Sequence, residues 1–118
     1  PLPLRWKRRK TRIHGSKNKG KKTMRELREL RQELDGIDRE LVHLFEKRMG
    51  VALEVAQYKA AHGLPVLDAS REEQVLQSRE AMLDNPALRA DVRALYVQIM
   101  ALSRGAQERW MKEAADHD

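Results

Sequence analysis

The chain has 118 residues, a formal net charge of +6, 41% hydrophobic and 4% aromatic residues, and no cysteine. The absence of cysteine excludes disulfide frameworks, thiol nucleophiles and cysteine-based zinc sites, and no apolar run approaches the roughly 18 residues of a membrane span. The length fits one domain. Because the basic N-terminus lacks the apolar stretch of a secretory signal, we expect a cytoplasmic protein.

The charge is divided unevenly along the chain. Residues 1–23 contain 10 Lys/Arg and no acid, whereas residues 24–118 contain 14 Lys/Arg and 18 Asp/Glu. The first segment therefore carries +10 and the second −4. We expect residues 1–23 to be a disordered extension or a segment left by cloning, and residues 24–118 to form the functional domain. Trp6 among the basic residues leaves RNA binding by this segment as an alternative.

From Leu27 onward, two interleaved series of mostly apolar residues recur every seven positions. One series is Leu27, Leu34, Leu41, Arg48 and Val55, and the other is Leu30, Ile37, Leu44, Val51 and Tyr58. This spacing predicts a helix with an a/d seam over residues 24–62, ended by Gly63 and Pro65. Such a helix is roughly 58 Å long at 1.5 Å per residue. Its apolar residues occupy several faces, which indicates a second copy of the chain.

A second, shorter helix is predicted after the connection formed by residues 63–68. It should run from about residue 69 to residue 83, with Asp68 or Ser70 as its N-cap. Ser70 also has the capping-box spacing from Glu73.

A third helix is predicted after a break at residues 84–86. Asn85 is a suitable N-cap, Pro86 suits the first helical position, and the apolar spacing continues to about Ala114. No segment alternates with period two over a useful length, so we predict an all-α chain of three helices.

Arg48 interrupts the apolar seam of the long helix. Lys59 follows 11 residues later, which places both cations on one face about 16 Å apart along the axis. Two cations on a partly buried face favour an anionic ligand. The alternative is a snorkelling side chain or a buried ion pair between Arg48 and Glu54 or Glu72.

Other polar residues carry weaker signals when each is taken alone. Ser103 and Gln107 have the i,i+4 spacing of one helix face. The histidines share no metal-ligand spacing, and neither a phosphate-binding loop nor a nucleophilic triad is apparent. We therefore predict neither a metal nor a nucleotide cofactor.

Together these residues resemble the all-helical (AroQ-class) chorismate mutases over residues 24–113. The matching motifs are L-R-x-x-[ILQ]-D-x-[IL]-D at residues 30–38, R-x10-K at Arg48 and Lys59, P-V-x-D-x-x-R-E at residues 65–72, and S-x3-Q at Ser103 and Gln107. The motifs occur in the family's order and at its separations. Residues 1–23 have no counterpart in the family pattern.

The resemblance implies an intertwined homodimer of three-helix chains with two equivalent active sites. The implied reaction is the rearrangement of chorismate to prephenate, toward phenylalanine and tyrosine, without cofactor, metal or covalent intermediate. Neither nucleic acid nor a membrane is an expected partner. Because 118 residues leave no room for a fused pathway enzyme, we expect a monofunctional isomerase.

The resemblance also assigns roles to eight residues. The substrate-binding residues are Arg31, Arg48, Asp68, Arg71, Glu72 and Ser103, and the catalytic residues are Lys59 and Gln107. By resemblance, Arg31 and Arg48 bind the two substrate carboxylates, helped by Ser103 and Arg71. Lys59 and Gln107 should donate hydrogen bonds to the ether oxygen as its negative charge grows. Glu72 and the backbone at Asp68 should hold the ring hydroxyl.

Arg31 lies 17 residues before Arg48, roughly 25 Å away along one helix at 1.5 Å per residue. A substrate smaller than about 10 Å cannot contact both residues in one chain. If both bind one substrate, Arg31 must come from the partner protomer.

Three other functions compete with this interpretation. An isochorismate pyruvate-lyase shares the fold and a similar anion site, but such lyases typically depart from the intact signature at residues 65–72. A helical nucleic-acid-binding module would use residues 5–22. A non-catalytic coiled-coil dimer would explain the seam but not the ordered polar residues.

Overall fold

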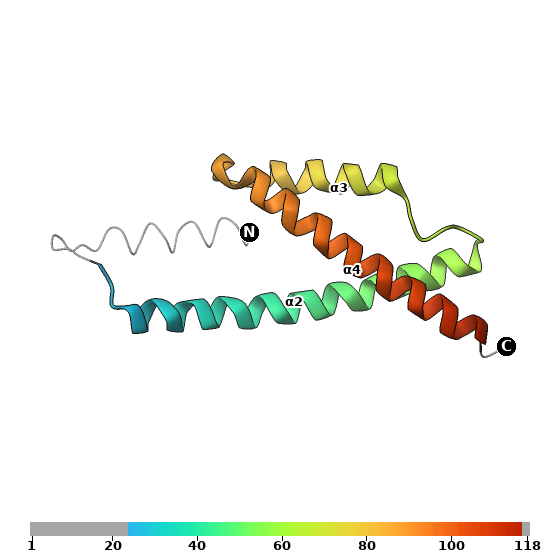
Figure 1. The fold of residues 1–118 in the computed structure, drawn as a ribbon, viewed down its shortest axis with the longest axis horizontal. Coiled ribbons are helices and arrows are strands. Elements are labelled where there is room, and N and C mark those ends of the chain that lie inside the picture. The colour runs from blue at the N-terminus through green and yellow to red at the C-terminus, as the bar shows by residue number, and fades with distance from the viewer. Residues whose placement is uncertain (1–23, 117–118) are drawn as a thin grey trace. The chain divides into compact units, whose positions relative to one another are not determined.

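The computed structural model describes residues 24–116, and Figure 1 shows the helices in chain order. They are α2 (Leu27–Ala61), α3 (Ala69–Ala81), the 3-10 helix η1 (Pro86–Leu88) and α4 (Arg89–Asp116). No strand occurs in this part of the chain, and the predicted all-α class with three α-helices is confirmed. None of these helices is both long and apolar enough to cross a membrane. The basic segment and its Trp6 lie outside the described residues.

The helix α2 has 35 residues and begins at Leu27, three residues later than the prediction. The carboxylate of Glu29 accepts a hydrogen bond from the backbone N–H of Glu26 at 3.3 Å. This is the arrangement by which a third-position acid caps a helix start, and it places the boundary at Glu26.

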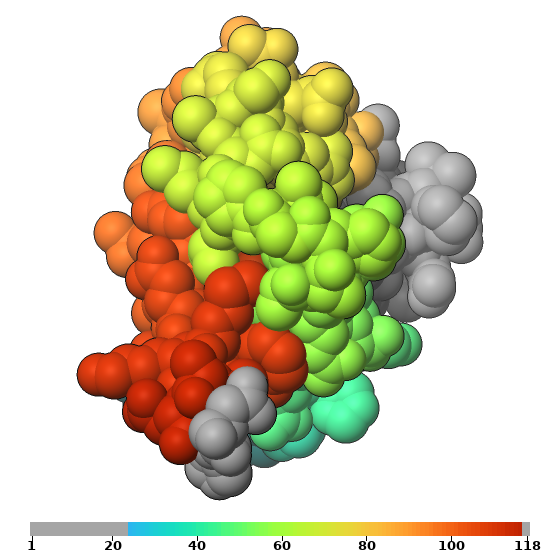
Figure 2. All heavy atoms as spheres, turned by 90° about the vertical axis from the view of Figure 1, so that its right-hand side faces the viewer, coloured from blue at the N-terminus to red at the C-terminus, as the bar shows by residue number. Residues whose placement is uncertain are grey.

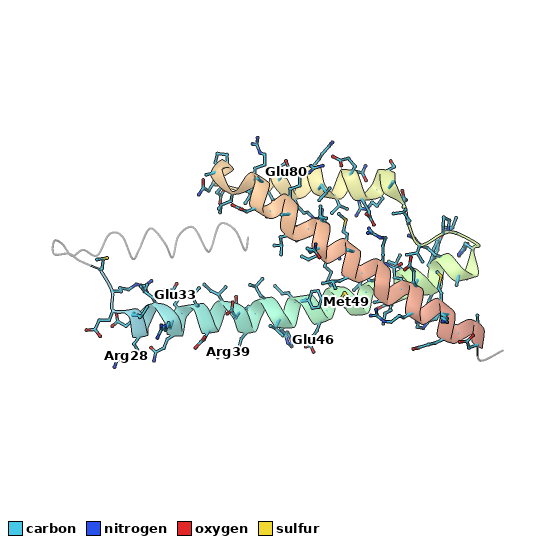
Figure 3. The ribbon with its side chains drawn as sticks, viewed as in Figure 1. Arg28, Glu33, Arg39, Glu46, Met49 and Glu80 are labelled. Carbon is cyan, nitrogen blue, oxygen red and sulfur yellow. The ribbon has the colours of Figure 1, made fainter. Side chains whose placement is uncertain are left out.

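The chain divides within α2 into two compact units, and the boundary along the sequence falls between Val42 and His43. In the first unit, the seam residues Leu27, Leu34 and Leu41 are 59%, 56% and 57% exposed. The labelled charged side chains of α2 are seen along the same helix in Figure 3. A single helix thus carries a long apolar stripe that stays open to solvent in the isolated chain.

The second unit contains the remainder of α2 together with α3 and α4. The helices α3 and α4 pack against each other, and Val75, Leu76 and Met100 form a buried cluster with Tyr96 against it. The buried hydrophobic residues of the described chain are Ala52, Ala56, Val75, Leu76 and Met100. This core is small, and none of its side chains is aromatic.

Local signals end α2 and begin the next two elements as physical chemistry predicts. Gly63 adopts a φ of 64°, and the N–H of Leu64 donates to the carbonyl of Lys59 at 2.8 Å. These are features of the Schellman motif that commonly ends helices. Asp68 caps α3, so the alternative cap at Ser70 is excluded. Asn85 is a cap as predicted, but of the 3-10 helix η1, so the third α-helix begins at Arg89 and not at Pro86.

Arg93 of α4 ties the two packed helices together. Its guanidinium donates to both oxygens of Glu73 at 2.8 and 2.9 Å and to Glu80 at 2.6 Å. Figure 3 labels Glu80 on α3. The hydrogen bond from Arg93 is the main cause that lowers the pKa of Glu73 below its ordinary value of 4.5. The same contact raises the pKa of Arg93.

The lowered pKa of Glu73 predicts a pH-dependent contribution to stability. A depressed carboxyl pKa stabilises the fold above the unfolded value of 4.5, and the contribution is lost as pH falls through the folded value. Glu73→Gln should therefore lower Tm slightly at pH 7, and the difference from the parent chain should shrink as pH falls below 4.5 and through the lowered pKa of Glu73. Thermal unfolding measured as a function of pH tests this. In an Arg93→Gln background the same substitution should have a smaller pH-dependent effect, because only the hydrogen bond from Gln77 remains, and an undiminished effect there would contradict the assignment.

Candidate active site

The second unit contains a cavity of about 300 Å³. Figure 2 views the end of this unit where the C-terminal half of α4 lies beside the end of α2. The cavity's apolar lining is Val51, Ala52, Val55, Val66, Val75 and Met100, and its polar lining is Arg48, Lys59, Asp68, Arg71, Glu72, Ser103, Arg104 and Gln107. Of the eight residues that the sequence predicts for the site, Arg31 alone is not among them. The fold thus gathers seven predicted residues, from three helices and the connection before α3, around one cavity.

Arg48 and Lys59 reach the cavity from α2, so the 11-residue spacing does place both on one face. The guanidinium of Arg48 lies 5.8 Å from the ring centroid of Tyr96, within the range of a cation–π contact. The ammonium of Lys59 donates to the carbonyl of Val66 at 2.7 Å. An ammonium has three donors, so this bond orients Lys59 while leaving donors for a ligand.

The start of α3 brings two oppositely charged predicted residues to the cavity. The Oδ1 atom of Asp68 accepts from the backbone N–H of Arg71 at 3.0 Å, which is the capping bond of α3. The Arg71 side chain is exposed and donates to Gln74 at 3.1 Å. Since a guanidinium has five N–H donors, Arg71 retains donors for an anion.

Ser103 and Gln107 reach the cavity from α4. They are 7% and 6% exposed, and the Gln107 amide nitrogen donates to the Ser103 hydroxyl at 3.3 Å. Within the described part of the chain, the amide oxygen of Gln107 is buried and has no hydrogen-bond partner. Rotation of the amide by 180° would let this oxygen accept from the hydroxyl and would leave the NH₂ group as a free donor. In either orientation the NH₂ group has an N–H that Ser103 does not take up, and Gln107 lines the cavity.

Arg104 lines the same cavity, and the sequence reasoning missed it. Its guanidinium donates to both carboxylate oxygens of Glu72 at 2.5 and 2.6 Å. Glu72 therefore pairs with Arg104, and the alternative pair of Arg48 with Glu72 is not formed. The sequence position of Arg104 could have indicated that it lies near the site, because Arg104 follows Met100 by one helical turn and is next to Ser103. The choice of ionic partner, however, depends on how α3 and α4 pack.

Arg31 belongs to the first unit. Its side chain is exposed, and it is not among the residues that line the cavity. A single chain thus presents the cavity without the eighth predicted residue.

The cavity combines four cationic side chains with two carboxylates, so its formal charge is positive although the domain as a whole is acidic. Guanidinium groups recognise carboxylates through paired hydrogen bonds. An ammonium and a buried amide lie on the same cavity. The fold and the cavity therefore define an all-helical domain whose cationic cavity suits a small organic anion.

Comparison with known proteins identifies the family. Residues 30–108 match the model of the family described as chorismate mutase type II. This match covers more than half of the chain, so the chain belongs to the chorismate mutase type II family, and the resemblance inferred from the sequence motifs is confirmed.

Several relatives carry informative names. The chain is 39% identical over 69 residues to the T-protein of Haemophilus influenzae, which covers 58% of this chain and 18% of that protein. It is 37% identical over 46 residues to the 4-amino-4-deoxychorismate mutase of Streptomyces venezuelae, a match that covers 39% of this chain and 45% of that protein. A solved structure, of a conserved hypothetical protein from Pyrococcus furiosus, matches with a TM-score of 0.59 and 29% identity. The match covers 72% of this chain and 99% of that protein. The matched region spans about a fifth of the T-proteins' length.

Proposed function

We propose that the chain is a chorismate mutase, which rearranges chorismate to prephenate in phenylalanine and tyrosine biosynthesis. The observation that carries this proposal is the convergence of Arg48, Lys59, Arg71 and Gln107 on one cavity. The reaction is intramolecular and needs neither proton transfer nor a covalent intermediate. The protein must therefore bind two carboxylates, hold the side chain of the substrate over the ring, and stabilise charge on the ether oxygen.

The arginines supply the carboxylate sites in this proposal. Arg48 is held on the cavity wall by its contact with the ring of Tyr96. Arg71 and the buried hydroxyl of Ser103 face the same cavity. Fixing both ends of the substrate favours the reactive chair conformation and removes part of the entropic barrier.

Lys59 and Gln107 supply the donors to the ether oxygen. As the C–O bond breaks, negative charge grows on this oxygen, and donors already in place stabilise it without reorganisation. The contact from Lys59 to the Val66 carbonyl and that from Gln107 to Ser103 fix the two side chains before a ligand arrives. The amide nitrogen of Gln107 carries a second N–H besides the one that donates to Ser103, and this N–H can donate to the ether oxygen. Glu72, with the backbone at Asp68, accepts the hydrogen bond of the ring hydroxyl.

The working form in this proposal is an intertwined homodimer with shared active sites. The seam residues Leu44, Val51, Val55 and Tyr58 of α2 are 48%, 54%, 40% and 59% exposed. Leu27, Leu34 and Leu41 of its first half are exposed as well. Apolar surface of this extent along one helix indicates a protein interface. Its heptad spacing fits a second copy of the same helix. In this arrangement Arg31 of the partner subunit completes the cation set of each cavity.

A chorismate assay tests the activity directly. Chorismate loss, followed at its ultraviolet absorbance, should be accelerated at least about 10⁶-fold over the uncatalysed reaction, with prephenate as product. Removal of residues 1–23 should leave the rate unchanged, since no proposed site residue lies there. Folded protein that leaves chorismate unchanged but releases pyruvate from isochorismate would make the chain a lyase. Nucleic-acid binding that requires residues 1–23, without mutase activity, would support the binding-module alternative.

A further inference from the structure

The pair formed by Glu72 and Arg104 is a partly buried charge pair at the cavity wall. The two side chains are 24% and 31% exposed, and one guanidinium nitrogen contacts both carboxylate oxygens. Each carboxylate oxygen has two lone pairs, so Glu72 can still accept a hydrogen bond from a ligand. Its negative charge, however, is already compensated.

A compensated carboxylate discriminates between neutral and cationic ligand groups. A hydroxyl needs only an acceptor, which the paired Glu72 still provides. An ammonium gains most from an uncompensated carboxylate, and near Arg104 it also meets a like charge. Placing a repulsive group beside an attractive one is a general way to reject a close analogue.

On this basis, and resting on the proposed mutase function, we propose that Arg104 is a specificity-determining residue that selects a ring hydroxyl over a ring amine. The two substrates it separates are chorismate and its analogue in which an amino group replaces the ring hydroxyl, 4-amino-4-deoxychorismate. Arg104 acts through Glu72 and is therefore a positioning residue with respect to the reaction. The neutral pair also keeps the surplus positive charge of the cavity for the substrate carboxylates.

The test compares the two substrates with the full chain. The parent protein should have the higher kcat/KM with chorismate. Arg104→Gln should raise the amine-to-hydroxyl ratio of kcat/KM about tenfold or more, because Glu72 is left uncompensated. Arg104→Lys keeps the charge and should retain a ratio near that of the parent. The double variant Glu72→Gln/Arg104→Gln has no carboxylate at this position, so its amine-to-hydroxyl ratio of kcat/KM should not show the increase expected for Arg104→Gln.

Arg93→Gln is the matched control, because it also removes ion pairs between α3 and α4 but Arg93 is not among the residues that line the cavity. Its ratio should equal that of the parent, and circular dichroism of each variant establishes that it is folded. Equal losses with both substrates in a folded Arg104→Gln variant would assign Arg104 a structural role only and overturn this proposal, while leaving the mutase function intact. A parent protein that converts neither substrate would overturn both.

Discussion

Mixing Arg31→Ala and Arg48→Ala subunits is expected to restore activity that neither variant has alone. Each homodimer should lose about a hundredfold or more in kcat/KM, because a substrate carboxylate is left without its guanidinium partner. Arg48 lines the cavity, whereas Arg31 belongs to the first unit. If Arg31 acts across the dimer, each mixed dimer contains one site with both arginines intact.

The size of the recovery follows from symmetry. Random exchange makes half of the dimers mixed, and each of these has one intact site of two, so about a quarter of the parent activity should return. Native mass spectrometry establishes that subunits have exchanged and that the assembly is a dimer. Arg28→Ala is a matched control, since Arg28 is also exposed on the first half of α2, and it should retain activity by itself. Complete exchange without recovery would refute the shared site.

The helices were predictable because their signals are local. The heptad spacing of α2, the glycine at its end and the asparagine before η1 each act over a few residues. The predicted start of α2 was too early. The sequence from Met24 onward contains no helix breaker, but the hydrogen bond from the Glu26 N–H to Glu29 caps the helix so that it starts at Leu27. Ser70 and Asp68 were both acceptable caps, and the observed bond to Arg71 selects Asp68.

The candidate site was predictable only in part. The motifs named seven residues that do line one cavity. Their spacing was informative because residues on one helix face, or in one short connection, lie close together in space. The pairing of Glu72 with Arg104 joins residues 32 positions apart. Such a pair depends on how α3 and α4 pack, and no local pattern specifies it. The residue-level roles in catalysis stay predictions until the variants are measured.

The second large effect is expected from Gln107→Glu, whose activity should move to acid pH. An amide donates a hydrogen bond at any ordinary pH, whereas a carboxyl group donates only when it is protonated. Gln107 is 6% exposed, and no shift of the new carboxyl pKa is needed for the prediction. As pH falls through the pKa of this carboxyl group, the protonated donor accumulates and activity should rise.

The magnitude follows from the donor's role. At neutral pH the variant should lose about 10²- to 10³-fold in kcat, the usual effect of removing one donor to a developing oxyanion, and acid pH should recover much of this loss. Gln107→Leu, which cannot donate, should be slow at every pH. Gln98→Glu places the same new charge at an exposed position on α4 and should leave the pH profile of the parent unchanged. Because substrate binding and folding can be monitored separately across the same pH range, a flat profile for folded Gln107→Glu would show that Gln107 is not the donor to the ether oxygen.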